Sequence, residues 1–370
     1  MKILYDHLGF MHKYGGVPKY FVKILEMYDS DVYELSVLLS NNYYLNEAGL
    51  KKTFPFFPNM GFKGKFAIMN YINKMYSLAN IWKGNYDIYH QTLYDTYALS
   101  SLPRSKIFVT TMHDLNFVKI PQFYQNRSQI LSFLLRSDLL KYQKESAKKA
   151  DHIIAISETT KHDLINEWDI DENKITVIYH GIAEPISDLP LSKLHSRPYV
   201  LFVGARVAYK NFNNAIRAFA IMAQKYDNID FICTGKSFDE SELNLFTELK
   251  IQNRVFCISA SENQMACLYR DALCFIYPSF YEGFGMPILE AMSYKCPVIL
   301  SKASCFPEIA CDAGLYFDPY SIDDILLNLE KVLTDSECVL SLKEKGSKRV
   351  LDFSWKKTAK MHLDVYKSLL

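Results

Sequence analysis

The residues best suited to chemistry in this sequence are two glutamates, Glu282 and Glu290, with seven residues between them. Pro287 suits the first turn of a helix, and Gly283 and Gly285 stand just before it. A helix that starts there exposes unpaired backbone N–H groups at the positive end of its dipole, which together can bind a diphosphate. Glu290, one turn into the helix, can accept hydrogen bonds from a ribose diol, while Glu282 stands nearer a sugar. The same spacing also fits a plain strand-turn-helix connection with two solvated carboxylates.

Two basic residues form a second group directly after the apolar run 199–203. Gly204 and Arg206 follow this run, and Lys210 opens the next helical pattern. Parallel α/β sheets bind their ligands at the carboxyl ends of the strands. A guanidinium at that edge can hold a pyrophosphate through two hydrogen bonds, and an ammonium adds a point charge. Taken alone, each of these two residues can equally be a solvated surface residue. Their position directly after a strand favours the functional role.

The first half of the chain carries two weaker signals. Gly15 and Gly16 follow the first apolar run and precede a helix with Pro18 near its start, which predicts a second loop suited to phosphate. No third glycine completes a dinucleotide-binding fingerprint. His113 closes the run 107–112, where an imidazole can bind a substrate hydroxyl or act as acid or base. A buried structural histidine is the alternative interpretation.

Alternating strands and helices have to position these residues, and the sequence contains that alternation twice. The first series of strand-like runs comprises residues 3–5, 32–39, 86–90, 107–112, 152–157 and 175–179. The second series comprises residues 199–204, 229–233, 254–258, 273–277, 297–300 and 315–317. The sequence therefore predicts two α/β domains, each with a parallel sheet.

The boundary between the two domains is expected in the proline-containing stretch 183–198. This gives an N-terminal domain of residues 1–190 and a C-terminal domain of residues 198–353. The apolar helix 354–370 lies beyond the last strand of the second series and can pack on either domain.

Composition favours a globular protein of the cytoplasm. The length of 370 residues exceeds the usual size of one core, and two domains imply a cleft between them. With 42 basic and 41 acidic residues, the chain has no overall attraction to nucleic acid. The eight cysteines form no Cys-x-x-Cys pair, which favours buried thiols in a reducing compartment. No secretory leader is expected at the N-terminus, and no run reaches the about 20 apolar residues of a spanning helix.

Two segments have the amino-acid composition of membrane-interface segments. Residues 50–84 interleave lysines with phenylalanines and tyrosines, and residues 130–149 set leucines beside arginine and lysines. Such segments can bring a protein to an anionic membrane as a peripheral protein. Alternatively, residues 50–84 form a loop and a surface helix whose aromatic side chains face the core.

In their order and distances, these groups resemble the retaining glycosyltransferases of family four. The most specific part of the resemblance is the stretch 278–292, with Pro297 at the next strand and Pro307-Glu308 and Gly314 downstream. Residues 203–212, 156–164 and 353–355 support it, so that it covers nearly the whole chain. The resemblance implies an α/β protein with the GT-B fold, in which the parallel sheets of two Rossmann-like domains face a central cleft. It also implies that the C-terminal helix 354–370 packs back on the N-terminal domain.

The resemblance also implies roles for the candidate residues. Glu290 would bind the nucleotide ribose, Glu282 would lie close to the donor sugar, and the turn between them would give backbone contacts. Arg206 and Lys210 would neutralise the leaving diphosphate, a task that needs no metal ion, and no cofactor is expected. The expected catalytic residues are Glu282, His113, Arg206 and Lys210. The expected donor-binding residues are Gly15, Gly16, Gly204, Arg206, Lys210, Glu282, Gly283, Phe284, Gly285, Met286, Pro287 and Glu290.

The implied reaction transfers a hexose from a nucleoside diphosphate to a hydroxyl of a glycan, with retention at the anomeric carbon. Only Glu282 is expected beside that carbon, whereas the hydrolase design needs two carboxylates, so same-face attack assisted by the leaving phosphate is favoured. The segment 111–117 resembles mannosyltransferases of bacterial surface-polysaccharide assembly, which suggests GDP-mannose and an acceptor linked to a polyprenyl diphosphate. His180 and Ala205 depart from the family pattern and make the donor less certain.

Four alternatives stay open. A UDP- or dTDP-sugar can replace GDP-mannose on the same fold. The pairs Asp29/Asp31 and Asp169/Asp171 have the spacing of a GT-A metal site, although both fall in connections where acidic residues commonly form turns. A sugar-nucleotide epimerase and a non-catalytic nucleotide-sugar-binding subunit of an assembly complex are the remaining two.

Overall fold

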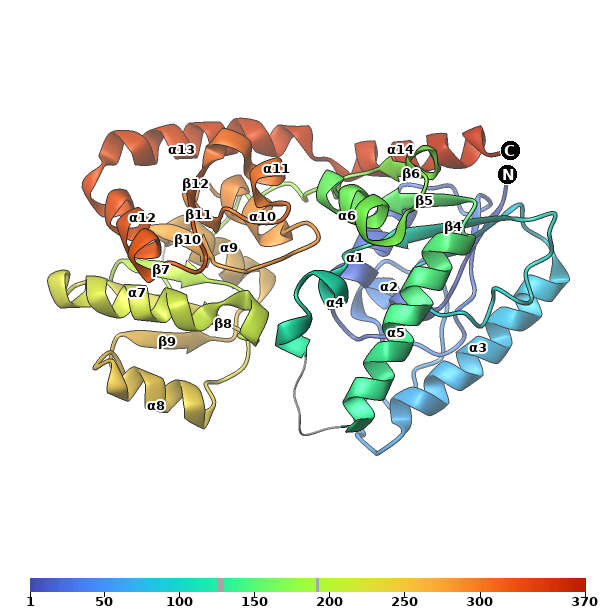
Figure 1. The fold of residues 1–370 in the computed structure, drawn as a ribbon, viewed down its shortest axis with the longest axis horizontal. Coiled ribbons are helices and arrows are strands. Elements are labelled where there is room, and N and C mark those ends of the chain that lie inside the picture. The colour runs from blue at the N-terminus through green and yellow to red at the C-terminus, as the bar shows by residue number, and fades with distance from the viewer. Residues whose placement is uncertain (125–129, 191–192) are drawn as a thin grey trace. The chain divides into compact units, whose positions relative to one another are not determined.

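The computed structural model describes residues 1–124, 130–190 and 193–370, and these residues divide into two compact units (Figure 1). The N-terminal unit contains residues 1–118, 125–181 and 354–370, as far as these are described. The C-terminal unit contains residues 119–124 and 182–353.

A six-stranded parallel sheet forms the centre of the N-terminal unit, in the order β2-β1-β3-β4-β5-β6. Its strands are β1 (Ile3–Tyr5), β2 (Tyr33–Leu35), β3 (Ile88–Gln91), β4 (Ile107–Met112), β5 (His152–Ala155) and β6 (Ile175–Val177). Helices follow the strands along the chain, and most strand residues are buried, as expected of a sheet covered on both faces.

Most helices of the first half, and the last helix of the chain, belong to this unit. They are η1 (Leu8–Phe10), α1 (Gly16–Leu25), α2 (Tyr43–Glu47), α3 (Lys65–Lys83), α4 (Asn116–Lys119), α5 (Ile130–Lys149), α6 (Glu158–Trp168), η3 (Glu172–Lys174) and α14 (Trp355–Ser368). The short helix η2 (Pro121–Tyr124) belongs to the C-terminal unit. Of the segment 130–149 that was predicted to approach a membrane, the side chains of residues 130–137 lie outside the described part of the structure.

The C-terminal unit repeats this plan with a sheet in the order β12-β11-β10-β7-β8-β9. Its strands are β7 (Tyr199–Phe202), β8 (Asp230–Thr234), β9 (Val255–Ile258), β10 (Cys274–Tyr277), β11 (Val298–Ser301) and β12 (Gly314–Phe317). Its helices are η4 (Ala208–Lys210), α7 (Phe212–Lys225), α8 (Glu240–Glu248), α9 (Glu262–Asp271), α10 (Met286–Ser293), α11 (Phe306–Ala310), η5 (Cys311–Ala313), α12 (Ile322–Thr334), α13 (Ser336–Arg349) and η6 (Val350–Asp352). The prediction of two α/β parts with parallel sheets is confirmed, whereas the expected cleft between them stays a prediction.

The last helix, α14, belongs to the N-terminal unit. Its Tyr366 hydroxyl lies 2.9 Å from that of Tyr5, and its Thr358 hydroxyl donates to the Tyr179 carbonyl at 2.8 Å. A Cβ at Gly181 would collide with the backbone at Trp355, where α14 begins. The glycine therefore permits the close approach of α14 to the end of the first series.

The two Asp-x-Asp pairs lie in turns. The Asp29 carbonyl accepts from Val32 N, and the Asp171 side chain caps η3 by accepting from Asn173 N. Asp169 is the left-handed residue that ends α6. All three roles are those of ordinary turn and cap residues.

Candidate functional site

The turn between β10 and α10 places the two candidate glutamates. Its last residue, Gly285, has a φ of 86°, and a Cβ there would lie 3.0 Å from Ile288 Cδ1 and 3.1 Å from Phe306 Cε1. Glycine is therefore required by both backbone conformation and space. The helix starts at Met286 with Pro287 in its first turn, as predicted, and no side chain caps its N-terminus. Pro287 has no N–H and Ile288 N donates to the Gly285 carbonyl at 2.9 Å, so it is the Met286 N–H and the positive end of the helix dipole that suit an anion here.

Glu282 and Lys210 meet directly in the C-terminal unit. Nζ of Lys210 lies 2.5 Å from Oε1 of Glu282 and donates to the Tyr277 hydroxyl at 2.9 Å. Ser279 Oγ donates to the same Glu282 oxygen at 2.9 Å. The network joins η4 to the end of β10 and to the loop that follows it.

The loop that carries Glu282 is also fixed through its backbone. Glu282 N donates to Ser304 Oγ at 3.2 Å, and the Ser304 hydroxyl donates back to the Glu282 carbonyl. Burial, with the Glu282 charge as the second cause, raises the pKa of Tyr277 well above its usual range. Tyr277 therefore stays a neutral phenol between the two charged groups.

Glu290 occupies a separate position on α10. The Tyr269 hydroxyl, from α9, donates to Glu290 Oε2 at 3.2 Å. Burial and, second, the Glu290 charge raise the pKa of Tyr269, which keeps the phenol protonated as a donor. Tyr269 thus orients the carboxylate for which ribose binding is predicted.

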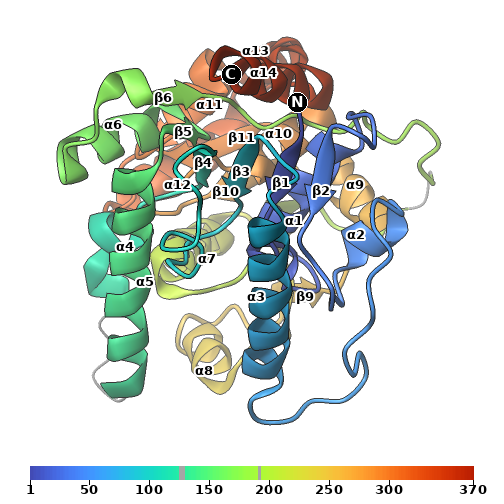
Figure 2. The ribbon, with the colours of Figure 1, turned by 90° about the vertical axis from the view of Figure 1, so that its right-hand side faces the viewer.

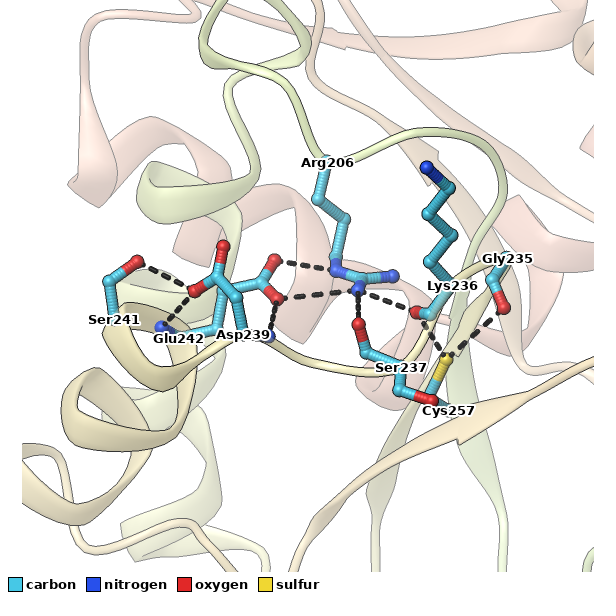
Figure 3. A network of polar contacts seen from close by, with 8 residues as sticks. All are labelled: Arg206, Gly235, Lys236, Ser237, Asp239, Ser241, Glu242 and Cys257. Carbon is cyan, nitrogen blue, oxygen red and sulfur yellow. Dashed lines mark hydrogen bonds and ion pairs between the residues drawn. The ribbon is translucent and has the colours of Figure 1, made fainter. Parts of the chain in front are cut away.

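Arg206 points toward α8, where its side chain is only 6% exposed (Figure 3). Its Nε donates to Glu242 Oε1 at 2.6 Å, and its Nη2 donates to the carbonyls of Lys236 and Ser237 at 2.7 and 3.0 Å. Glu242 in turn forms a capping box with Asp239 at the start of α8. In this arrangement the guanidinium fixes the loop after β8, and the described structure gives it no contact with Lys210 or Glu282.

Two glycines lie near the carboxyl ends of β7 and β8, close in sequence to Arg206 and to the loop that its side chain contacts. Gly204 lies two residues after β7 with a φ of 117°, and Gly235 directly follows β8 with a φ of 115°. Nothing lies within 4 Å of a Cβ built at Gly204, and the Gly204 carbonyl lies 3.6 Å from one built at Gly235. Both positions favour glycine because of their left-handed backbone. Lys236, the next residue, is exposed on this loop.

The predicted residues of the first half lie in the N-terminal unit. Gly15 has a φ of 150° and precedes α1, which begins at Gly16, so the predicted glycine turn before a helix is confirmed. No side chain caps this helix start, which suits an anion in the same way as α10.

His113 is buried in the N-terminal unit at the end of β4. Its Nε2 lies 3.2 Å from the Thr92 carbonyl, and its backbone N–H donates to the Tyr94 hydroxyl at 2.8 Å. Burial lowers its pKa to about 4. The ring is therefore neutral at neutral pH, and its predicted part in catalysis stays a prediction.

Several partners of the candidate residues were missed by sequence reasoning. They are Tyr277, Ser279, Ser304, Tyr269 and Glu242. Tyr277 and Ser279 flank the motif that drew attention to Glu282, so their nearness in sequence was an available signal. The other three come from distant elements, and no local pattern identifies them.

Among the residues that the structure describes, no group of three or more histidine, cysteine, aspartate or glutamate side chains is placed to hold a metal ion.

Two family models match consecutive stretches of the chain. The model described as Glycosyltransferase Family 4 matches residues 14–184, and that described as Glycosyl transferases group 1 matches residues 190–349. The second stretch contains Lys210, Glu282 and Glu290.

Two curated relatives are bacterial mannosyltransferases. The chain is 29% identical over 220 residues to the O-antigen chain mannosyltransferase RfbU of Salmonella typhimurium, with 59% of each protein covered. It is 27% identical over 276 residues to the O-antigen chain mannosyltransferase B of Escherichia coli, with 70% of each covered. The alignment thus spans less than two thirds of the length of the first relative.

Among solved structures, the sucrose-phosphate synthase of Thermosynechococcus elongatus is similar over 100% of this chain and 98% of its own. The TM-score is 0.75 at 20% sequence identity. This likeness, with the two six-stranded parallel sheets, confirms the predicted GT-B fold class.

Proposed function

The chain belongs to the glycosyltransferases of family four and group 1, and from this premise we propose that it transfers a mannosyl residue from GDP-mannose to a glycan hydroxyl. The observation that carries the proposal is the ion pair between Lys210 and Glu282 beside the uncapped start of α10. A cation and the positive end of a helix dipole suit a diphosphate, and a carboxylate next to them suits a sugar.

We place the leaving diphosphate at Lys210 and the first turn of α10. Among described contacts, Lys210 uses two of its three N–H donors, on Glu282 and Tyr277, so a third can bind a phosphate oxygen. Negative charge grows on the diphosphate as the glycosidic bond breaks, so these donors stabilise the transition state more than the bound substrate. No step in this scheme requires a metal ion or another cofactor.

We propose a retaining reaction in which the acceptor attacks from the face that the diphosphate leaves. Glu282 is held by Lys210 and Ser279, and it orients the sugar. No second carboxylate is assigned to the anomeric carbon, so the leaving phosphate accepts the acceptor proton. Glu290, oriented by Tyr269, binds the ribose of the donor.

Mannose is proposed because both curated relatives reported above are named mannosyltransferases of O-antigen chains. For the same reason we propose that the acceptor is a surface-polysaccharide intermediate carried on a polyprenyl diphosphate. Such an acceptor is embedded in a membrane, so the enzyme would work as a peripheral protein at the cytoplasmic face. Among the described residues no helix has the length and apolar character to cross a bilayer.

A donor screen tests this function directly. Purified protein is incubated with GDP-mannose, UDP-glucose or dTDP-rhamnose, and nucleoside diphosphate release and thermal stabilisation are measured with and without excess EDTA. GDP release from GDP-mannose that survives EDTA, and rises on addition of lipid-linked acceptor, supports the proposal. If only a UDP- or dTDP-sugar stabilises the protein or is turned over, that sugar nucleotide is the donor instead of GDP-mannose. Loss of activity in EDTA would support a metal-dependent reaction. Product formed without any acceptor would point to an epimerase. Donor binding without turnover on any acceptor would make the chain a non-catalytic subunit.

A further inference from the structure

The outer face of α3 carries four large apolar side chains. Ile68, Tyr71, Met75 and Trp82 are 47, 66, 48 and 67% exposed. Their spacings of three, four and seven residues place them on a single stripe of the helix. A surface helix of a globular protein normally turns such a stripe toward the core. Here the stripe faces outward, and Figure 2 shows α3 in the foreground of the N-terminal unit.

The inner face of the same helix combines the buried apolar side chains of Met69 and Ile81 with a row of polar side chains. Asn73 Oδ1 accepts from Leu38 N and Leu39 N at 2.9 and 2.8 Å, and its Nδ2 donates to the Leu39 carbonyl at 2.8 Å. Asn80 Nδ2 donates to Ser36 Oγ at 3.1 Å. These amides satisfy the backbone just beyond the edge strand β2, which explains why the polar side lies inward.

Ser77 and Asn70 extend this inner row. Ser77 Oγ lies 2.7 Å from the Tyr97 hydroxyl, and Asn70 Oδ1 lies 2.9 Å from His7 Nε2. The helix is therefore attached to the unit through hydrogen bonds along its polar side. The apolar stripe is left for something else to cover.

The loop before α3 adds further exposed apolar side chains. They are Phe54, Phe57, Met60 and Phe62, which are 59, 50, 61 and 40% exposed. Lys65, in the first turn of α3, donates to the carbonyls of Phe57 and Met60 at 2.6 and 2.9 Å, which fixes the loop to the helix start. The alternative prediction, that the aromatic side chains of residues 50–84 face the core, is wrong for these residues. We call the four stripe residues and these four loop residues together the α3 face.

The charge of residues 50–84 indicates which kind of partner the α3 face can bind. Residues 50–84 contain no aspartate or glutamate and six lysines, namely Lys51, Lys52, Lys63, Lys65, Lys74 and Lys83. Lys74 forms an ion pair with Asp95 at 3.0 Å, so the other five lysines supply the positive charge of this segment. A second copy of the chain docked on this face would bring lysines against lysines. An anionic lipid surface attracts the same lysines and accepts the apolar side chains between them, and tyrosine and tryptophan favour such interfaces.

We propose that the α3 face docks the N-terminal unit on an anionic lipid bilayer, with the stripe and the loop inserted among the headgroups. The inference deepens the proposed function, since an acceptor carried on a lipid is met at a membrane. The ring of Phe66, at the start of α3, stacks on His12 with centroids 5.4 Å apart. Phe66 is not part of the α3 face, but through it the helix that carries this face contacts the loop that leads to Gly15 and Gly16, where a phosphate site is predicted.

Vesicle sedimentation tests the proposal with the full-length chain. Wild type is expected to sediment with equimolar phosphatidylcholine and phosphatidylglycerol vesicles at low salt and to remain in solution with phosphatidylcholine alone. The triple variant Tyr71→Ser, Met75→Ser and Trp82→Ser should bind these vesicles at least about tenfold more weakly. The matched control, Leu327→Ser, Leu340→Ser and Leu351→Ser, removes side chains that are 64, 61 and 82% exposed in the C-terminal unit and should bind like wild type.

Tryptophan fluorescence locates the contact. Of the three tryptophans, Trp168 and Trp355 are 4 and 6% exposed, so a change in emission on lipid binding should come from Trp82. A blue shift and quenching by brominated lipid are expected in wild type and should be absent in Trp82→Phe. Wild type that stays in solution with anionic vesicles, or equal binding by both triple variants, overturns the proposal. Self-association lost only in the first triple variant would assign the α3 face to a second copy instead.

Failure of this inference is distinguishable from failure of the proposed function. GDP release from GDP-mannose without lipid reports on the C-terminal unit, and the first triple variant should keep that rate within about twofold of wild type. Loss of vesicle binding with this rate preserved is the expected result. No donor turnover in wild type, with vesicle binding intact, would reject the enzymatic proposal and leave the docking surface in place.

Discussion

Lys210 and Glu282 form an ion pair with 2.5 Å between Nζ and Oε1, and each side chain is 13% exposed. In so sheltered a pair, removing one partner leaves the other charge poorly compensated. Tyr277, which accepts from Lys210, and Ser279, which donates to Glu282, keep the pair in one geometry. The pair is therefore held in one geometry by side chains of its own unit.

Lys210→Ala and Glu282→Ala should each lower turnover at least about tenfold, because donors aimed at developing charge contribute much of such rate enhancements. Steady-state kinetics with GDP-mannose provide the measurement. The double variant should be less impaired than the product of the two single effects, since the residues act as a unit.

The matched control for this cycle is Lys225→Ala, which removes the lysine of an exposed pair with Glu330 in the same unit. Its kinetics should stay near wild type because exposed pairs contribute little. Wild-type turnover by both Lys210→Ala and Glu282→Ala would refute the site assignment.

Arg206 gives a different prediction because its guanidinium holds Glu242 and two carbonyls of the loop after β8. Arg206→Ala should lower the free energy of unfolding by about 1–3 kcal/mol and weaken donor binding together. Glu242→Gln should reproduce part of both effects although it lies on α8. Urea unfolding and donor titration measure the two quantities.

Different results are expected if Arg206 binds the diphosphate directly. If Arg206→Ala weakens donor binding at unchanged stability and Glu242→Gln binds donor like wild type, the residue binds the diphosphate directly, as the sequence resemblance implies. Arg206→Lys further separates a structural role from direct binding of the diphosphate. Lysine restores the charge but lacks the planar guanidinium that bonds Glu242 and both carbonyls.

The strands were predictable because a parallel sheet covered on both faces needs runs rich in apolar and β-branched residues, and Ile107–Met112 is such a run. The turn before α10 was predictable because glycine and proline have local conformational causes. The partners of Arg206 were not, because Glu242 and the two carbonyls approach it only once β7 and β8 pair.

The orientation of α3 shows a second limit of sequence reasoning. Helical periodicity identifies a stripe such as Ile68, Tyr71 and Met75, but it does not say which side faces the core. The answer depends on the unpaired backbone at Leu38 and Leu39, which Asn73 satisfies. Only the folded structure shows that these backbone groups, just beyond the edge strand, require hydrogen-bond partners.

Asp6 should make stability fall as pH rises. It is fully buried at the end of β1, and burial raises its pKa to about 7 against the bonds it accepts from Thr92 and Leu8. Since the folded carboxyl keeps its proton to higher pH than the unfolded one, its cost is absent below about pH 4 and complete above about pH 7. Asp6→Asn keeps an oxygen for these bonds and removes the charge. It should be more stable than wild type by about 2–4 kcal/mol above pH 7, and this advantage should shrink toward pH 4.

Urea unfolding of both proteins across this pH range measures the difference. An advantage that does not vary with pH would assign it to packing instead of ionisation.

His362 should produce the opposite dependence. It lies on α14, with Nε2 at 2.6 Å from the Tyr20 hydroxyl and Nδ1 at 3.2 Å from that of Tyr366. Burial and, second, the charge of His113 lower its pKa to about 3. As pH falls below about 6.5 the unfolded chain takes up the proton first, so the stability that neutral His362 confers is full above that pH and is lost toward pH 3. At about pH 5 the loss from this residue alone is about 2 kcal/mol.

His362→Gln removes the titration and keeps a hydrogen-bonding side chain for α14. Its free energy of unfolding should therefore fall less than that of wild type between about pH 7 and pH 5, even if the variant is less stable at neutral pH. Burial chiefly lowers the pKa values of His90 and His180, and the His362 charge contributes to both, so His362→Gln should also lessen the loss of stability that these two residues cause in acid. Parallel pH profiles for variant and wild type would show that His362 does not link α14 to acid stability.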